Sequence, residues 1–210
     1  MSARGGRGMP EVCGRAEGLA RIIAYVGDRW GRAGPPEDAY GRVTDSGRYA
    51  TLHAVGWKSL DELERRYAVT RATSTEPDVH GSDPAPAVRL VPADPAAAPL
   101  TMVLDAYPGL LVRMGCRSGG HLPVCGCDAC DETVEECTEQ LRDVLAALTP
   151  GTFGECVVRD HGWWHERWYQ TPSGGSSGRI RIVRQQRRAL QGTLSGSELR
   201  WAPWPERAIR

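Results

Sequence analysis

Apolar residues recur every three or four positions in three stretches of the chain, which is the spacing of one helix face. The most regular stretch runs from about 49 to 67, after Thr44 and Asp45, either of which suits a helix N-cap. The second runs from about 129 to 148, where Asp128 is a candidate cap. The third runs from about 15 to 30 and ends before the glycines and prolines of residues 31–36. The pattern therefore predicts three helices, one of them N-terminal.

Short apolar runs bounded by turn residues predict strands. Three are expected near 87–91, 100–105 and 110–114, and the last two flank Pro108 and Gly109, a turn pair that predicts an antiparallel hairpin. A second hairpin is expected from 155–159 and 163–169 around the turn 160–162, followed by a strand at 179–184. Residues 70–86, 115–130 and 173–178 are polar or rich in glycine and predict loops.

Strands mixed with separate helices are typical of the α+β class. We expect an antiparallel sheet of about five to six strands packed with two main helices, plus an added N-terminal helix. The predicted organisation is an N-terminal extension over 1–35, one α+β domain over 36–194 and a flexible C-terminal tail over 195–210.

Composition adds bounds on location and partners. The 26 basic and 26 acidic residues give a formal net charge of zero, so no overall field attracts nucleic acid or an anionic membrane. No apolar run approaches the roughly 20 residues that span a bilayer, and no secretory leader is recognisable. We therefore expect a cytoplasmic protein whose seven cysteines are thiols or metal ligands rather than disulfides.

The strongest chemical signal is a cluster of three cysteines, Cys125, Cys127 and Cys130, within six residues. Thiolates of this kind bind zinc, which takes four tetrahedral ligands, and Gly126 could permit the sharp turn that brings the sulfurs together. The candidate fourth ligands are Cys116 and His121, both just upstream. No catalytic residues and no organic cofactor site are predicted.

Two other interpretations of the cysteines stay open. Reduced cysteine is often a small buried residue, so the cluster could simply pack against a sheet. Alternatively, Cys127 and Cys130 form a C-x-x-C pair at a helix N-terminus, where the helix dipole favours a thiolate and redox chemistry. The neighbouring acids oppose that effect, because negative charge disfavours thiolate formation.

Two further stretches have unusual composition. Residues 163–169 alternate aromatic and polar side chains, and on a regular strand His165 and Glu166 face opposite ways, so they cannot act as an acid–base pair with each other. Residues 179–188 hold five arginines that could contact nucleic-acid phosphates. The zero net charge and the absence of a known binding motif argue against nucleic acid as a partner.

Four segments together resemble an uncharacterised family of small actinobacterial proteins, a domain of unknown function. They are residues 36–44, 89–95, 98–103 and the stretch C-G-C-D-A-C-D-E at 125–132, which is the most specific of them. The resemblance covers about residues 36–190 and implies that both termini are additions. It implies no activity.

The sequence therefore predicts a non-enzymatic binding or regulatory domain with a structural cysteine loop that can hold zinc. The alternatives are a thiol-dependent enzyme or redox protein using Cys127 or Cys130, and weak nucleic-acid binding through the arginines of 179–188. A protein or small molecule is a possible partner, and a membrane is not expected.

Overall fold

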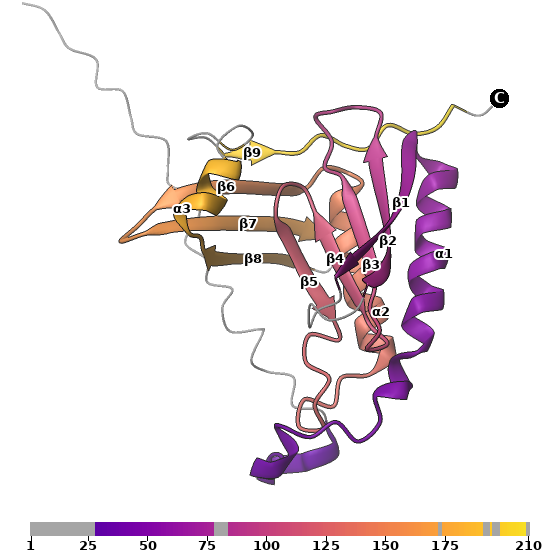
Figure 1. Cartoon of the computed structure of the whole chain (residues 1–210), viewed down its shortest axis with the longest axis vertical. Helices are drawn as coiled ribbons and strands as arrows, with labels where there is room; N and C mark the ends of the chain where they lie inside the picture. The colour runs from indigo at the N-terminus through magenta and orange to yellow at the C-terminus, as the bar shows by residue number, and fades with distance from the viewer. Residues whose placement is uncertain (1–27, 78–83, 172–173, 191–193, 195–197, 209–210) are drawn as a thin grey trace, which may run out of the picture.

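A computed structural model describes residues 28–77, 84–171, 174–190, 194 and 198–208 of the chain. Its nine strands form two antiparallel sheets, one of five strands in the order β1-β2-β3-β4-β5 and one of four in the order β8-β7-β6-β9. Helix α1 (Thr51–Arg66) borders the first sheet, and helix α2 (Val134–Leu148) lies behind it (Figure 1). The α+β class is confirmed, and the strands divide between two sheets.

The first sheet is a meander in which each strand pairs with the next along the chain. Its strands are β1 (Val69–Pro77), β2 (Pro84–Pro92), β3 (Leu100–Leu104), β4 (Leu110–Met114) and β5 (Ser118–Leu122). All five residues of β3, the central strand of this sheet, are buried. The main core lies between this sheet, α1 and α2, and includes Leu52, Leu60, Met102, Leu141 and Leu148.

The second sheet extends to one side of the first, and its strands cross the direction of the first sheet (Figure 1). It comprises β6 (Phe153–Arg159), β7 (Trp163–Thr171), β8 (Gly174–Arg181) and the short β9 (Leu199–Arg200). Helix α3 (Arg184–Leu190) follows β8 and closes a small cluster of Ile182, Leu190 and Leu194. The predicted hairpin at 155–169 is confirmed as β6 and β7.

The helix caps differ in part from the expectation. Helix α2 begins after Thr133, whose hydroxyl accepts the backbone N–H of Glu136 while the Glu136 carboxylate accepts the backbone N–H of Thr133. This reciprocal pair satisfies two backbone donors at the helix start. Asp128 is therefore not the cap of this helix. The segment before α1 forms three short 3-10 helices, η1 (Asp28–Ala33), η2 (Glu37–Ala39) and η3 (Ser46–Tyr49).

Several predicted loops are strands. The range 70–86, predicted as a loop, contains β1 and the start of β2, which pair over nine positions. The range 115–130 contains β5, and the range 173–178 contains the first half of β8. In each case the neighbouring strand supplies partners for the backbone N–H and C=O groups. The strand therefore forms without an alternating pattern of apolar residues in its own sequence.

The described part of the C-terminal segment packs against the rest of the fold. Trp201 and Trp204 are buried, and the indole N–H of Trp204 donates to the carbonyl of Ala98 at 2.9 Å. Ala68 N–H donates to Pro205 O, and Arg207 N–H donates to Arg66 O, which ties the segment to the end of α1. Of the predicted N-terminal helix, residues 15–27 lie outside the described residues, and residues 28–33 form η1.

Candidate metal centre

The cysteine loop, residues 123–133, connects the end of β5 to the start of α2. Its two ends are held together by Glu132, whose carboxylate accepts the backbone N–H of Val124 at 3.2 Å and of Cys125 at 2.6 Å. The carbonyl of Glu132 accepts the hydroxyl of the fully buried Tyr49 at 2.9 Å. The loop is therefore closed at its base and attached to the segment that precedes α1.

Asp128 anchors the middle of the loop to the same segment. Its buried carboxylate accepts the Thr44 hydroxyl, the Thr44 backbone N–H at 2.9 Å and Arg42 Nε at 2.8 Å. The hydrogen bonds from Thr44 and the ion pair with Arg42 hold the pKa of this carboxyl well below its usual range. Because these donors occupy both of its oxygens, Asp128 acts as a fixed anion of the scaffold.

Two backbone contacts complete this attachment. Asp128 N–H donates to Arg42 O at 2.8 Å, and Ala129 N–H donates to Ala39 O at 3.2 Å. The fully buried Ala39 packs with Cys127 and Ala129 in a small apolar cluster, with Trp30 and Cys130 at its edge. The loop thus has its own core, formed from residues about 90 positions apart in the chain.

Gly126 is required for a reason other than the one predicted. It does not have the left-handed φ that would demand glycine. A Cβ at this position would overlap the hydroxyl of Tyr107, which lies directly over the glycine and contacts its carbonyl at 3.4 Å. The glycine therefore permits a close approach of Tyr107 to the loop backbone.

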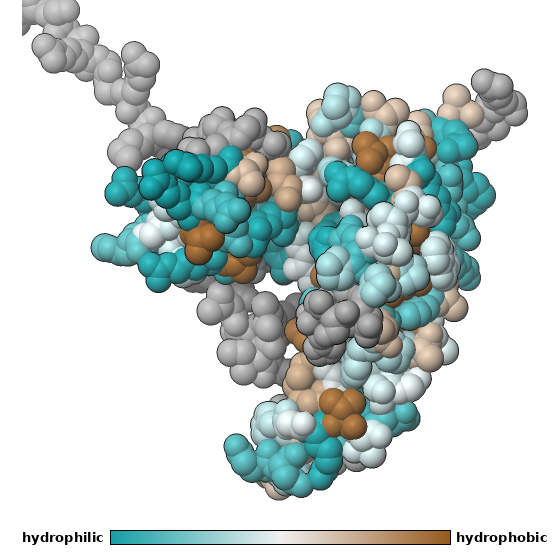
Figure 2. All heavy atoms as spheres, in the orientation of Figure 1, coloured by the Kyte–Doolittle hydropathy of each residue, from teal (hydrophilic) through white to brown (hydrophobic). Residues whose placement is uncertain are grey.

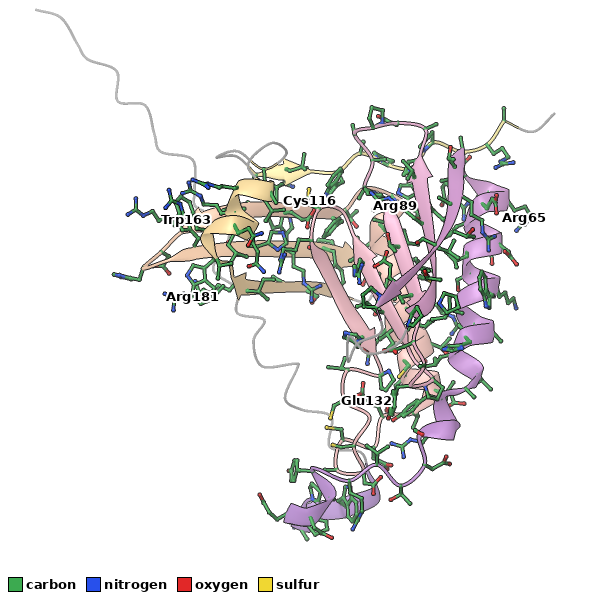
Figure 3. All side chains as sticks on the ribbon, in the orientation of Figure 1. Arg65, Arg89, Cys116, Glu132, Trp163 and Arg181 are labelled. Atoms are coloured by element: carbon green, nitrogen blue, oxygen red, sulfur yellow. The ribbon has the colours of Figure 1, made fainter. Side chains whose placement is uncertain are left out.

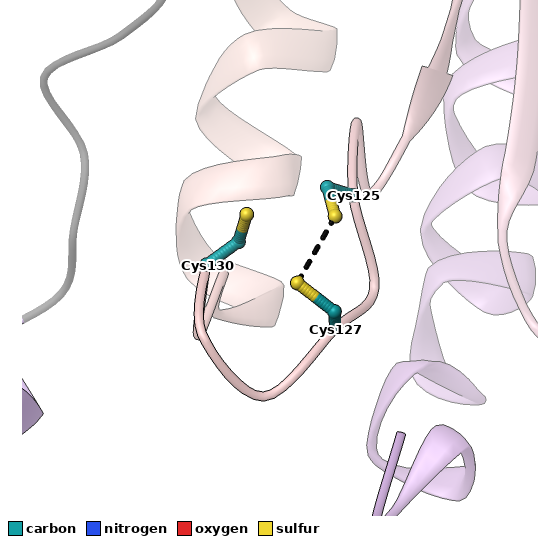
Figure 4. Close-up of side chains that lie close together, drawn as sticks. All are labelled: Cys125, Cys127 and Cys130. Carbon is teal, nitrogen blue, oxygen red and sulfur yellow. Dashed lines mark hydrogen bonds between the residues drawn. The ribbon is translucent and has the colours of Figure 1, made fainter. Parts of the chain in front are cut away.

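The loop brings the three predicted sulfurs together (Figure 4). The Sγ atoms of Cys125, Cys127 and Cys130 all lie within 4.8 Å of one another, and Cys125 and Cys127 are 3.2 Å apart. Zinc–sulfur bonds of about 2.3 Å at tetrahedral angles place sulfurs about 3.8 Å apart. The observed separations bracket that value, so a shift of about half an ångström in the sulfurs would accommodate an ion.

The electrostatics of the cluster favour one thiolate first. Burial raises the pKa of Cys127, but backbone N–H groups of Cys130 and Ala129 and the neighbouring thiols outweigh burial, and the net pKa is lowered. Burial and the two other sulfurs raise the pKa of Cys130 to about 12. A bound cation would counter the repulsion from the neighbouring sulfurs that raises the pKa of Cys130.

The two predicted fourth ligands are not part of this group within the described residues. Cys116 lies in the turn before β5, and the five residues of β5 carry the chain about 16 Å from that turn to the loop. Figure 3 shows Cys116 beside the second sheet and Glu132 well away from it, beyond the other end of β5. His121 is closer, because it lies near the end of β5 that leads into the loop.

A cavity of about 410 Å³ adjoins the sulfurs. Cys125, Cys127 and His121 line it, together with Tyr40, Tyr107 and other mostly apolar residues. This volume falls within the range of small-molecule sites. Cys125 is exposed and Cys127 is buried, so the cluster lies between solvent and the interior.

A second polar cluster, which sequence reasoning missed, lies where the two sheets meet. The carboxylate of the fully buried Glu155 accepts the Ser118 hydroxyl at 2.7 Å, His165 Nε2 at 3.0 Å and Trp201 Nε1 at 3.0 Å. It also accepts the backbone N–H groups of residues 116, 117 and 118. On the paired strands β6 and β7, Glu155 is a diagonal neighbour of His165, a relation that the predicted hairpin already contained.

This second cluster is saturated. Burial raises the pKa of Glu155, but the hydrogen bonds from His165, Cys116 N–H and Ser118 outweigh burial and leave it below its ordinary value. Each oxygen of the Glu155 carboxylate already accepts at least two hydrogen bonds. The Glu155–His165 pair therefore holds the β4–β5 turn and Trp201 against the second sheet. His165 pairs with Glu155 and not with Glu166, in agreement with the predicted opposite faces of β7.

The fold and the loop define an α+β protein of two antiparallel sheets with a three-cysteine cluster. The profile of a family of unknown function, DUF6226, matches residues 16–208, and the chain belongs to this family. The match extends beyond the predicted 36–190 at both ends, so the two terminal segments are parts of the family and not additions. Comparison with curated proteins and with solved structures found no match. None of the described helices is long and apolar enough to cross a membrane.

Proposed function

We propose that the chain is a non-enzymatic binding or regulatory domain in which Cys125, Cys127 and Cys130 hold one zinc ion as thiolates. The observation that carries the proposal is the convergence of three sulfurs on a loop closed by Glu132 and anchored through Asp128. Three soft thiolate ligands select zinc over magnesium or calcium, which prefer oxygen. Reduced thiols of this kind fit a protein of the cytoplasm.

The ion would act as a staple of the loop. It would join the end of β5, the start of α2 and, through Asp128 and Ala39, the segment before α1. Structural zinc sites contribute on the order of 10 kcal/mol of apparent binding free energy, which is comparable to the whole stability of a domain. Loss of the ion would therefore loosen this end of the molecule.

Three protein ligands leave one tetrahedral position for a further ligand. The adjoining cavity is lined by Cys125 and Cys127 themselves, so water or a small molecule inside it would reach the ion. His121 lines the same cavity and is the remaining protein candidate for this position, whereas Cys116 is held at the other end of β5 by the contact of its N–H with Glu155.

The test is metal content combined with thiol titration on protein purified under reducing conditions. We expect close to one zinc per chain, three thiols that react slowly until a chelator is added, and a fall in melting temperature on chelation. Cobalt substitution should give the sulfur-to-cobalt charge-transfer absorption of a thiolate site. Cys127→Ser should abolish these signals.

The matched control is Cys116→Ser, which removes a cysteine outside the cluster and should keep full zinc content. His121→Ala separates the two candidates for the fourth position. If histidine fills it, zinc affinity falls by tenfold or more, and if water fills it, affinity is unchanged. Absence of metal from wild-type protein supplied with zinc would refute the proposal.

A second candidate function is thiol redox chemistry, favoured by the 3.2 Å separation of Cys125 and Cys127 and the lowered pKa of Cys127. The Cys127 thiolate would attack a small disulfide of the glutathione class and expel one thiol. The Cys125 thiolate would then attack the mixed disulfide and expel the second thiol, leaving a Cys125–Cys127 disulfide. This function predicts one fast-reacting thiol at neutral pH without chelator, which the zinc site does not.

A further inference from the structure

Arginines and tryptophans gather at one end of the four-stranded sheet. Strand β6 ends where β7 begins and β8 ends, and the register pairs Arg159 with Trp163 and Trp164 with Arg181. Helix α3 continues from the same end. We call this surface the basic end and define it by Arg159, Trp163, Trp164, Arg179, Arg181, Arg184, Arg187 and Arg188.

The zero net charge of the whole chain conceals an uneven distribution of charge, with arginines concentrated at the basic end. Residues 153–200 hold eight arginines and four carboxylates, and Glu155 is buried in the pinned cluster at the opposite end of the strand pair. At the basic end Asp160 pairs with Arg179 at 3.3 Å, and Glu166 on β7 is the cross-strand partner of the same arginine. Within the described residues, no acidic side chain pairs with Arg181, Arg184 or Arg188, and all three are exposed. Figure 2 shows mostly hydrophilic side chains around the basic end, on the left of the view.

The tryptophans are interleaved with the arginines. The Arg179 guanidinium lies 4.5 Å from the Trp164 ring centre, and those of Arg187 and Arg159 lie 4.2 Å and 5.8 Å from the Trp163 ring centre. Both indoles are only partly buried. Trp164 Nε1 donates to the carbonyl of Asp160 at 2.8 Å, which fixes the orientation of its ring on the hairpin turn.

We infer that the basic end binds single-stranded nucleic acid, with Trp164 stacking on a base and Arg181, Arg184 and Arg188 binding phosphates. The proposal rests on residues separate from the cysteine loop and does not depend on the metal. Charge complementarity supplies the attraction, because each arginine that meets a phosphate releases condensed counterions. Oriented aromatic rings among arginines favour unpaired bases, whose faces are free to stack, over a duplex, whose bases are already stacked.

The test uses the full chain and a fluorescein-labelled oligothymidylate, followed by fluorescence anisotropy at several salt concentrations. The three phosphate contacts of Arg181, Arg184 and Arg188 predict a slope of log affinity against log salt of about −2 for a single strand. The variant Arg181→Ala/Arg184→Ala/Arg188→Ala should weaken binding by about tenfold or more and bring the slope to about zero. All three side chains are exposed, so this variant keeps the fold.

The matched control is Arg65→Ala/Arg66→Ala/Arg89→Ala, which removes the same charge from exposed positions on α1 and β2, away from the basic end (Figure 3). It should bind almost as wild type. Trp164→Ala should weaken binding about fivefold to a hundredfold, and Trp164→Phe, which keeps an aromatic ring, should restore most of the affinity.

Three results would overturn the inference. The first is equal weakening by the two triple variants, which would indicate a general charge effect. The second is binding of a duplex of the same length as tightly as the single strand. The third is binding to phosphatidylserine vesicles with no binding to the oligonucleotide, which would assign the surface to a membrane. Cys127→Ser should leave oligonucleotide binding unchanged, whatever its effect on zinc.

Discussion

Glu155 offers the sharpest test of how the two sheets are joined. The variant Glu155→Gln keeps the size of the side chain but replaces one carboxylate oxygen with an amide NH₂. Oxygen Oε1 accepts Arg117 N–H, Ser118 N–H, the Ser118 hydroxyl and His165, and Oε2 accepts Cys116 N–H and Trp201 Nε1–H. In its better orientation, the glutamine amide keeps its oxygen at the Oε1 position. Its NH₂ group then takes the Oε2 position and faces two buried donors, Cys116 N–H and Trp201 Nε1–H.

The expected cost follows from those two donors. A buried donor that loses its acceptor costs about 1–3 kcal/mol, so the variant should lose about 2–6 kcal/mol of unfolding free energy. This is a large share of the 5–15 kcal/mol typical of a domain. Urea denaturation at neutral pH should show a lower midpoint with an unchanged slope, because the surface exposed on unfolding is the same.

The control is Glu139→Gln, on the exposed side of α2, which should change the unfolding free energy by no more than about 0.5 kcal/mol. A loss below 1 kcal/mol for Glu155→Gln would refute the reasoning. It would mean that the carboxylate is not a necessary acceptor at the junction and that the two sheets are held by apolar contacts alone.

Because the pKa of Glu155 is lowered in the folded state, wild-type stability should fall as pH drops below about 4.5, and the stability gap to Glu155→Gln should narrow there, measured by urea denaturation across acidic pH. Gly126→Ala should strain the cysteine loop by about 1–3 kcal/mol and weaken zinc binding in chelator competition, and adding Tyr107→Phe should relieve part of the effect, since the hydroxyl is the nearest of the Tyr107 atoms that a Cβ would meet. Trp204→Ala should lower stability by about 3–5 kcal/mol in thermal unfolding, because the ring is buried edge-on to Tyr67; a loss under 1 kcal/mol would show that this segment is dispensable.

The parts of the fold that the sequence predicts are those in which local pattern and tertiary structure agree. Helices α1 and α2 bury a regular face, and the strand pairs β3–β4 and β6–β7 meet around short turns. Strand β1 escaped prediction because six of its nine side chains are exposed, Thr73 and Thr75 among them, and none is fully buried. It is stabilised by its ladder with β2, which no local pattern reveals.

The candidate metal centre shows the same division. Three cysteines within six residues must lie near one another, so their convergence was predictable. The partners that fix the loop come from distant positions in the chain, so they could not be predicted from the sequence. Asp128 binds Arg42 and Thr44 across more than 80 residues, and Gly126 directly contacts Tyr107, 19 residues earlier in the chain. Cys116 lies outside the three-cysteine group because β5, whose glycines give no strand signal in the sequence, separates it from the loop.

The path of residues 199–207 has a consequence for how the chain acquires its structure during synthesis. This segment places Trp201 in the Glu155 cluster and Trp204 against the first sheet. It also forms backbone hydrogen bonds with Arg66 and Ala68, which leave the ribosome much earlier. Until it emerges, the core residues that Trp201 and Trp204 cover, Tyr67 among them, stay exposed to water, and the nascent chain is at its greatest risk of self-association. We expect truncation before Leu199 to yield aggregates rather than a smaller folded protein.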